Sequence, residues 1–338
     1  MSDRPAEPAT APADPPRRNL IDRTADRVDA WQRRVPPLAL GFAVTKKYGE
    51  DRGGQLAMLL AYRGFFAIFP LLLAFVNVLG LVLAGNDELR NDLIDSALSN
   101  IPVIGGQIRT DAAGGSVAVV VASVLVSLWA GLGLLEMLQE SLNTVWGVPM
   151  FERPPWVVRR LRSLPAAVVV IGCLVLSGSR SWLFGGADGV VGQFVGALLP
   201  FLGGALCYLG LHWALCQRKV PFPAQLPGAA FVGLGWFGLQ LLGEWYVNRF
   251  VVRSSDTYGV FVIVFGVLSW SYLLGTLYLY GNELASVLHE RRWPRSLSGR
   301  DLTDADRAAY RVVAEREVRV RGTELTVDVP RDPAPPPS

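Results

Sequence analysis

"DTYGVFVIVFGVLSWSYLLGTLYLYGNELASVLHE", residues 256–290, decides how this 338-residue chain folds. From Gly259 to Gly281 the stretch contains no charged residue. A helix crosses the roughly 30 Å of bilayer hydrocarbon with about 20 apolar residues, and it satisfies its own backbone hydrogen bonds on the way. The stretch therefore predicts a membrane-spanning α-helix at about residues 258–288.

The residues just before it, "YVNRFVVRSSDTYGVF" at 246–261, form a short charged connection between two apolar stretches. Tyr246 and Tyr258 are placed where amphipathic aromatic rings sit at the headgroup level. Gly259 lets the chain turn back towards the next helix. The connection also carries three charged side chains, which we predict to form an outer rim: Arg249, Arg253 and Asp256.

Similar apolar stretches recur along the chain, and each is long and continuous rather than alternating as in a barrel strand. They predict an all-α polytopic membrane protein with six transmembrane helices. The predicted spans are residues 56–84, 116–138, 164–184, 193–216, 226–247 and 258–288.

The composition agrees with this class of protein. Hydrophobic residues make up 51% of the chain and charged residues only 18%, against about 25% in soluble proteins. The three cysteines lie in or beside apolar stretches, so we expect no disulfide framework. The Pro- and Ala-rich N-terminus lacks the apolar core of a signal peptide, and we expect the first span to act as the insertion signal.

Lysine and arginine in the connections predict the orientation. Residues 17–52 hold nine, 139–163 four, 216–225 two and 289–300 four, whereas 85–115 and 248–257 hold two each and 186–192 none. The positive-inside rule then places both termini in the cytoplasm, as an even number of spans requires. The predicted division is a basic tail at 1–54, a membrane domain at 55–290 and a charged tail at 291–338.

Both tails contain predicted helices. Residues 20–35 are amphipathic, which suits either a helix on the inner leaflet or a solvated helix packed on the cytoplasmic loops. Residues 303–306, "TDAD", predict the capped start of a short helix. The last residues, "RDPAPPPS", are typical of disorder.

Charged residues inside spans are costly and therefore mark candidate sites. We predict an inner cluster of Arg63, Glu136 and Glu283, with Glu140 one turn beyond Glu136 on a face that also carries Asn143. An outer cluster would join Arg180 and Glu244 to the Arg249 and Arg253 rim. The alternative is that each side chain snorkels to its own interface.

Other patterns carry weaker predictions. Pro70 should kink the first span, whereas Pro165 and Pro227 are expected near helix starts. His212 and Cys216 share a helical face, but Cys207 points away from it, so we expect no metal site there. We expect no catalytic or cofactor-binding residue elsewhere in the chain.

Four stretches together resemble the YihY/BrkB family over about residues 40–290. They are "LLAYRGFFAIFPLLLAFVNVLG", "SLWAGLGLLEMLQESLNTVWGV", "VPFPAQLPGAAFVGLGWFGLQLLGEWYVNRF" and the opening stretch. The family often has a second aromatic residue where Arg63 stands. The family pattern falls on Tyr62, Phe69, Pro70, Leu142, Asn143, Trp146, Pro227, Gly228, Tyr246, Tyr258, Gly259, Gly281 and Glu283.

The resemblance implies a multi-pass protein of the bacterial cytoplasmic (inner) membrane, with virulence and ribonuclease labels but no settled activity. We favour a transporter-like or lipid-handling bundle, because a pure scaffold has less reason to keep Glu136 and Glu283 in the bilayer. The transport prediction would fail if the bundle were packed solid, with no polar cavity that reaches these residues. The alternatives are a non-catalytic membrane scaffold or envelope-integrity factor and, less favoured, a ribonuclease.

Expected partners are membrane lipids and a second copy of the chain in a homo-oligomer. We expect neither nucleic acid nor ATP as a partner, since the chain lacks a G-x-x-x-x-G-K-[ST] motif.

Overall fold

The structure, a computed structural model, describes residues 20–82, 117–178, 190–246, 260–297 and 302–329. Within these ranges every regular element is a helix and no β-strand occurs, which confirms the all-α prediction for this part of the chain. Six helices have 23 residues or more: α3 (Gly53–Val82), α6 (Val117–Val145), α7 (Trp156–Gly178), α9 (Val190–Leu215), α10 (Phe222–Tyr246) and α12 (Val260–His289).

Each predicted span falls on one of these six helices, and five of them contain a window long and apolar enough to cross a membrane. The exception is α7, whose first turns carry Arg159, Arg160 and Arg162. A sixth crossing and the cytoplasmic placement of both termini stay predictions. The five windows are Gly53–Leu71, Ala118–Val145, Leu198–Leu215, Phe222–Gly243 and Val264–His289.

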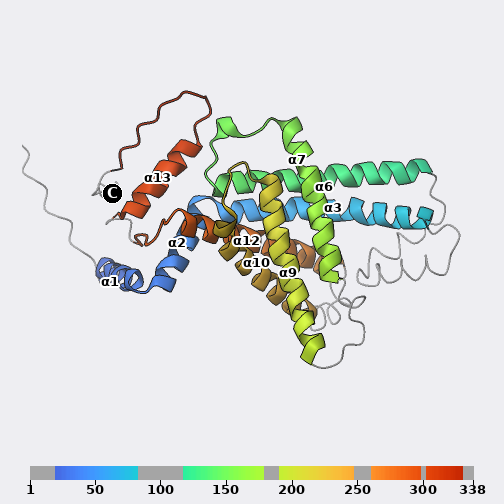
Figure 1. The fold of residues 1–338 in the computed structure, drawn as a ribbon, viewed down its shortest axis with the longest axis horizontal. Coiled ribbons are helices and arrows are strands. Elements are labelled where there is room, and N and C mark those ends of the chain that lie inside the picture. Colours follow the sequence, from blue (N-terminus) through green and yellow to red (C-terminus); the bar gives the residue numbers. More distant parts are fainter. Residues whose placement is uncertain (1–19, 83–116, 179–189, 247–259, 298–301, 330–338) are drawn as a thin grey trace, which may run out of the picture.

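The six long helices form a ring in chain order. Contacts run from α3 to α6, α7, α9, α10 and α12, and α12 returns to pack on α3. In Figure 1, α3 and α6 lie side by side along the molecule, and α9, α10 and α12 are grouped on one side of them. The first and last long helices are therefore neighbours, which brings the two tails to the same end of the ring.

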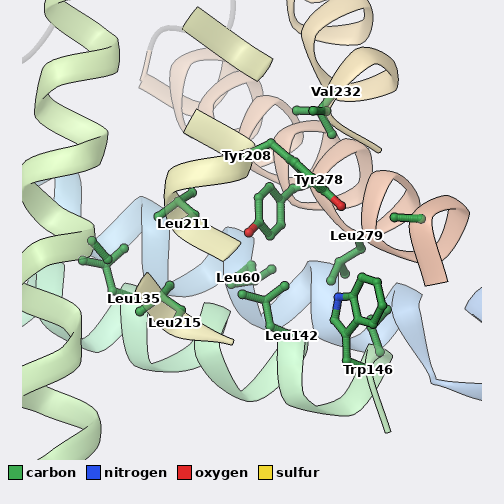
Figure 2. Packing of buried hydrophobic residues seen from close by; sticks show 14 of the residues in the cluster. Leu60, Leu135, Leu142, Trp146, Tyr208, Leu211, Leu215, Val232, Tyr278 and Leu279 are labelled. Carbon is green, nitrogen blue, oxygen red and sulfur yellow. The ribbon is translucent and has the colours of Figure 1, made fainter. Parts of the chain in front are cut away.

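The packed core lies towards that end, where α6, α9 and α12 meet. Figure 2 shows Leu142 and Trp146 of α6 together with Tyr208 of α9 and Leu279 of α12, and each of these side chains is at most 1% exposed. Lipid tails are as apolar as leucine, so such packing stabilises a membrane bundle chiefly through close van der Waals contact.

Glycine allows α10 and α12 to approach closely. A Cβ atom at Gly228 would lie 2.5 Å from the carbonyl oxygen of Gly281 and 2.4 Å from the Tyr208 hydroxyl. A Cβ atom at Gly281 would lie 2.4 Å from Val232. Both glycines belong to the family pattern, and the structure gives the physical reason why a side chain does not fit at either position.

Prolines lie inside the long helices rather than at their first residues. Pro227 is the sixth residue of α10 and Pro165 the tenth of α7, so the prediction that both stand near helix starts is wrong. The predicted spans began too late, because α7 extends before the apolar segment by a turn or more that carries three arginines, and α10 begins four residues earlier at Phe222. Pro70 lies within α3, and its carbonyl oxygen accepts a hydrogen bond from Ser127 of α6.

Three shorter helices gather at the end of the ring that carries the tails (Figure 1), here called the tail end: α1 (Leu20–Arg34), α2 (Pro36–Glu50) and α13 (Asp304–Arg316). Helix α1 confirms the predicted helix at 20–35, and α13 confirms the helix predicted after Thr303. The Thr303 side chain accepts from the Asp306 backbone N–H in a complete capping box. Helix α2 was not predicted.

Candidate functional site

The ring encloses a cavity of about 300 Å³, here called the central cavity. All six long helices line it. Its wall is almost entirely apolar, with leucine, valine and glycine predominating and only a few hydroxyl and thiol groups. The residues that line it include Leu60, Gly64, Leu134, Leu135, Cys173, Gly204, Cys207, Tyr208, Trp236, Ser271, Gly275 and Tyr278.

Small residues keep this cavity open. A Cβ atom built on Gly64 would meet Ser271 and Leu134 at 3.9–4.0 Å, which is ordinary contact, so a side chain at this position has room to enter the cavity. Gly204 differs, because its Cβ atom would lie 2.8 Å from Trp236. Gly64 is thus the position where added volume fills the cavity without forcing the helices apart.

A polar layer lies between the central cavity and the tail end. Asn282 of α12 accepts a hydrogen bond from the Trp146 indole at 3.2 Å, and its oxygen lies 3.3 Å from Nδ1 of His212. The Asn143 side chain accepts from the backbone N–H of Gln217 at 3.3 Å. The family-pattern residues Asn143 and Trp146 therefore tie the end of α6 to α9 and α12, a structural role in this arrangement.

Glu283, the deepest predicted site residue, belongs to a buried ion network at the tail end. Its carboxylate lies 2.6 Å from the Lys47 ammonium of α2, which also bonds Asp51 at 2.6 Å and the Val145 carbonyl oxygen at 2.7 Å. Arg316 of α13 joins at 2.5 Å from Asp51. Lys47, Asp51, Glu283 and Arg316 are here called the tail-end network, and each side chain is at most 10% exposed.

The ion pairs hold Lys47 and Asp51, which lie outside the spans, in their charged forms. Burial alone would lower the pKa of Lys47, but the Glu283 and Asp51 carboxylates more than offset it and raise the pKa above its ordinary value. Burial alone would raise the pKa of Asp51, whereas Lys47 and Arg316 lower it below its ordinary value. Buried charges that are paired and hydrogen-bonded in this way hold elements in one arrangement.

A second cluster ties α13 to the rest of the tail end. The fully buried Arg295 guanidinium lies 2.7 Å from Asp306 and 2.7 Å from Glu50, and the Lys46 ammonium lies 2.9 Å from Asp306. Burial raises the pKa of Asp306, but the bonds from Lys46 and Arg295 lower it well below its usual range.

The predicted inner cluster differs from what the structure brings together. Glu136 pairs with Arg160 at 3.1 Å, and Glu140 pairs with Arg153 and lies 3.7 Å from Arg159. Depth along a helix can be predicted from sequence, but the direction in which each side chain points relative to its neighbours cannot. The carboxylates meet cations from α2, from α7 and from the connection between α6 and α7 instead of Arg63.

Arg63 stands apart from these pairs. Its guanidinium donates to the Gly133 carbonyl oxygen of α6 at 2.9 Å, and the side chain is exposed on the surface of the bundle. No carboxylate of the described ranges lies within ion-pair distance of it.

The predicted outer rim falls largely outside the described residues. This holds for Arg180, Arg249, Arg253 and Asp256, and also for Tyr258 and Gly259. Glu244 and Tyr246 lie in the last turn of α10, where the backbone alone is described. The outer cluster stays a prediction.

The structure and the predicted site differ most at the central cavity, which the sequence reading missed. Arg63, Glu136 and Glu283 do not line it, so this cavity is not the polar cavity on which the transport prediction depends. The glycines at 64, 203, 204 and 275 were the available signal, since they come from three spans that meet at this point. The burial of Lys47 could not be predicted, because a lysine that precedes the first span is expected to be solvated.

Comparison with known proteins agrees with the resemblance in the sequence. YfkH of Bacillus subtilis (strain 168), a protein named as ribonuclease-like, is 23% identical over 267 residues, which cover 73% of this chain and 94% of that protein. A UPF0761 membrane protein of Alkalilimnicola ehrlichii is 24% identical over 291 residues, 82% of this chain and 65% of its own length. A UPF0761 membrane protein of Neisseria meningitidis serogroup B is 26% identical over 271 residues, which cover 74% of this chain and 63% of that protein.

The chain thus spans somewhat less than two thirds of the length of the two UPF0761 relatives. No solved structure matches it significantly. The family model described as Virulence factor BrkB matches residues 44–305, which include the tail-end network up to Glu283 and every helix that lines the central cavity. The chain therefore belongs to the Virulence factor BrkB family of membrane proteins.

Proposed function

We propose that this protein is a lipid-handling membrane protein whose central cavity holds an apolar chain, in the way a transporter or lipid carrier holds its substrate. The observation that carries the proposal is the cavity itself, about 300 Å³ in the middle of the ring and lined by all six long helices. Pockets that hold small ligands begin at about this volume and are mostly apolar, with a few polar groups.

The chemistry of the wall selects the class of ligand. An ion or sugar in this cavity would lose its hydration and gain few hydrogen bonds, because the wall offers only scattered hydroxyl and thiol groups. A lipid acyl chain gives up no hydration and no hydrogen bond by moving there from the surrounding bilayer. The carboxylates that favoured a transporter-like bundle over a scaffold are engaged by Lys47 and Arg160.

The energy source of any movement would lie outside the chain, because its sequence has no phosphate-binding loop for ATP. The proposal is therefore for passive, gradient-driven or partner-driven handling of a lipid.

Photo-crosslinking of the purified protein in lipid nanodiscs tests this proposal. The probe is a phospholipid with a diazirine at the end of one acyl chain, and peptide mapping identifies the residues that it labels. We expect labelling of cavity residues such as Leu135, Tyr208 and Tyr278. Gly64→Leu should remove most of this labelling by filling the cavity, whereas Gly131→Leu is a matched control, because Gly131 lies on α6 outside the cavity with nothing within 4 Å of its Cβ position.

Labelling confined to the outer surface of the ring, or labelling of the cavity that Gly64→Leu leaves unchanged, would contradict the proposal. Either result would favour a scaffold, the second candidate. The observation in favour of a scaffold is the tail end, where α2, α12 and α13 are joined by buried ion pairs into one surface.

The ribonuclease name of one relative leads to no comparable proposal here. Cleavage of RNA needs a general acid and a general base beside a basic groove. The chain has two histidines, and His212 is 2% exposed beneath the central cavity, next to Asn282. We expect no nuclease activity, which an assay of the purified protein on labelled RNA checks directly.

A further inference from the structure

Arg63 is a charged side chain in an environment that does not neutralise it. It lies in the apolar window Gly53–Leu71 of α3 and is exposed on the side of the ring that a bilayer would cover. Its bond goes to a neutral acceptor, the Gly133 carbonyl oxygen. An ionised arginine within a span costs about 2.5–3.5 kcal/mol even on insertion scales, and natural membrane proteins offset this cost with a partner.

A second guanidinium approaches the same strip of α6 from the other side. Arg160 of α7 donates to the Trp129 carbonyl oxygen at 2.9 Å. Residues 129 and 133 are four apart, so their carbonyl groups lie on one face about 6 Å apart along the helix axis. Arg63 and Arg160 thus reach neighbouring points of one helix, one from α3 and one from α7.

The charges in this group do not cancel. Arg160 is paired with Glu136 at 3.1 Å, whereas no carboxylate in the described part of the chain pairs with Arg63. The group formed by Arg63, Arg160 and Glu136 contains two basic side chains and one acidic side chain, a formal excess of one positive charge. A phosphodiester carries one negative charge, and guanidinium groups bind phosphate with two parallel hydrogen bonds.

Tryptophan marks the level of the group in the membrane. The Arg160 guanidinium stacks on the Trp129 ring at 3.9 Å, and Trp129 lies 6.5 Å from Trp156. Both indoles are more than half exposed, at 63% and 52%. Exposed tryptophans of membrane proteins gather at the headgroup region, where lipid phosphates lie. Trp156 precedes the predicted third span at 164–184, whereas Trp129 lies inside the predicted second span at 116–138, so the group reaches from the headgroup region into the bilayer. Leu59 and Phe66 lie one turn from Arg63 on α3, and their exposed apolar side chains offer a surface for acyl chains.

We propose that Arg63 and Arg160, on the Gly133–Trp129 strip of α6, bind the phosphate of an anionic phospholipid. This inference rests on the proposed lipid handling and names its lipid class. Under the predicted orientation the lipid comes from the cytoplasmic leaflet. Leu60 and Gly64 on α3 and Leu134 on α6, neighbours of these residues along their helices, line the central cavity, so the phosphate site stands close to the proposed acyl-chain site.

Native mass spectrometry of the purified full-length protein tests the site. The protein is incubated with equal amounts of phosphatidylglycerol and phosphatidylcholine that carry identical acyl chains, and the retained ratio is measured. We expect wild type to favour phosphatidylglycerol, and Arg63→Gln to reduce this preference about tenfold, as befits loss of a charged hydrogen-bonded contact. Arg63→Lys keeps the charge but loses the planar guanidinium, so its preference for phosphatidylglycerol should lie between those of wild type and Arg63→Gln.

Arg162→Gln is the matched control, because Arg162 is an exposed arginine of α7 outside the group. The inference is overturned if wild type shows no preference, or if Arg162→Gln lowers the preference as much as Arg63→Gln does. The wild-type arm decides even where Arg63→Gln fails to fold.

Free phosphate is the other source of the same chemistry. Inorganic phosphate at millimolar concentration should leave the preference intact; if it abolishes the preference, the site binds a soluble phosphate compound and the lipid assignment is wrong. The headgroup ratio is read independently of acyl-chain crosslinking. A headgroup preference without acyl-chain labelling of the cavity residues therefore contradicts the cavity proposal. Labelling of the cavity residues without a headgroup preference contradicts the phosphate site.

Discussion

The Lys47 ammonium lies 2.6 Å from the Glu283 carboxylate and joins α2, which precedes the first predicted span, to α12, which forms the last. Both side chains are at most 5% exposed. A buried pair of this kind stabilises little relative to an apolar substitute, but removal of one partner leaves an uncompensated charge.

Replacement of Lys47 by an apolar residue of similar size should therefore destabilise the protein strongly. We expect Lys47→Met to destabilise the protein by about 3–5 kcal/mol, measured by thermal unfolding in detergent, because Glu283 and Asp51 both lose their common cation. Lys219→Met, on an exposed lysine, is the control. Adding Glu283→Gln to Lys47→Met should recover part of the loss, and a double variant no better than the single one would show that the pair is not coupled.

Docking of the last described helix should depend on Arg316. Its bond to Asp51 at 2.5 Å and to the Thr144 carbonyl oxygen at 3.2 Å holds α13 against the ends of α2 and α6. Arg316→Gln should raise the rate of hydrogen exchange in α13 by at least tenfold while the long helices stay protected. Arg311→Gln changes an exposed arginine of the same helix and should leave exchange unchanged. Equal exchange in the two variants would contradict the role of Arg316.

The tail end should hold its arrangement over a wide pH range. Because the pKa of Asp51 is lowered, its contribution is complete above the ordinary value of 3.8 and is lost as the pH falls below that value. Because the pKa of Lys47 is raised, its contribution is complete below the ordinary value of 10.5 and is lost above it. Trypsin sensitivity of α13 in the pH range where the protease works should therefore be flat, and a step near pH 6–7 would contradict the assigned charges.

The close approach of α10 and α12 predicts opposite effects of two glycine substitutions on one helix. Gly228→Ala should destabilise by about 1–3 kcal/mol, because its Cβ atom would lie 2.5 Å from the Gly281 carbonyl oxygen. Gly238→Ala, with nothing within 4 Å, should be neutral or stabilise by up to about 1 kcal/mol through helix propensity. Thermal unfolding of both variants checks the difference, and similar values would mean that the helices part easily at Gly228.

The helices were predictable because each long apolar run has a single physical solution in lipid. The capped start of α13 was also predictable, since residues 303–306 carry a local signal. The partners of the carboxylates were not, because Lys47 and Glu283 are 236 residues apart and their meeting depends on how α2 turns beneath the ring. Arg63 was assigned to Glu283 on depth alone, and depth leaves the facing direction of a helix undetermined.

The central cavity could not be predicted either, because it too depends on how distant segments are placed relative to one another. Gly64, Gly204 and Gly275 each look like ordinary small residues of a span, and only the order of the helices around the ring brings them together. An empty space is a property of several helices at once, and no single segment contains its signal.

The ring that closes between α3 and α12 has a consequence for biosynthesis. Four of its six helix–helix contacts can form before α12 is made, but the contacts of α12 with α10 and with α3 are missing until residues 260–289 have been made. Until then Lys47 lacks its pair with Glu283, and Leu60 contacts lipid instead of Gly275. The insertion of α12 is therefore the closing step of assembly, and a chain that stops before it leaves Lys47 with Asp51 but without Glu283, and leaves an open apolar seam exposed to the quality control of membrane proteins.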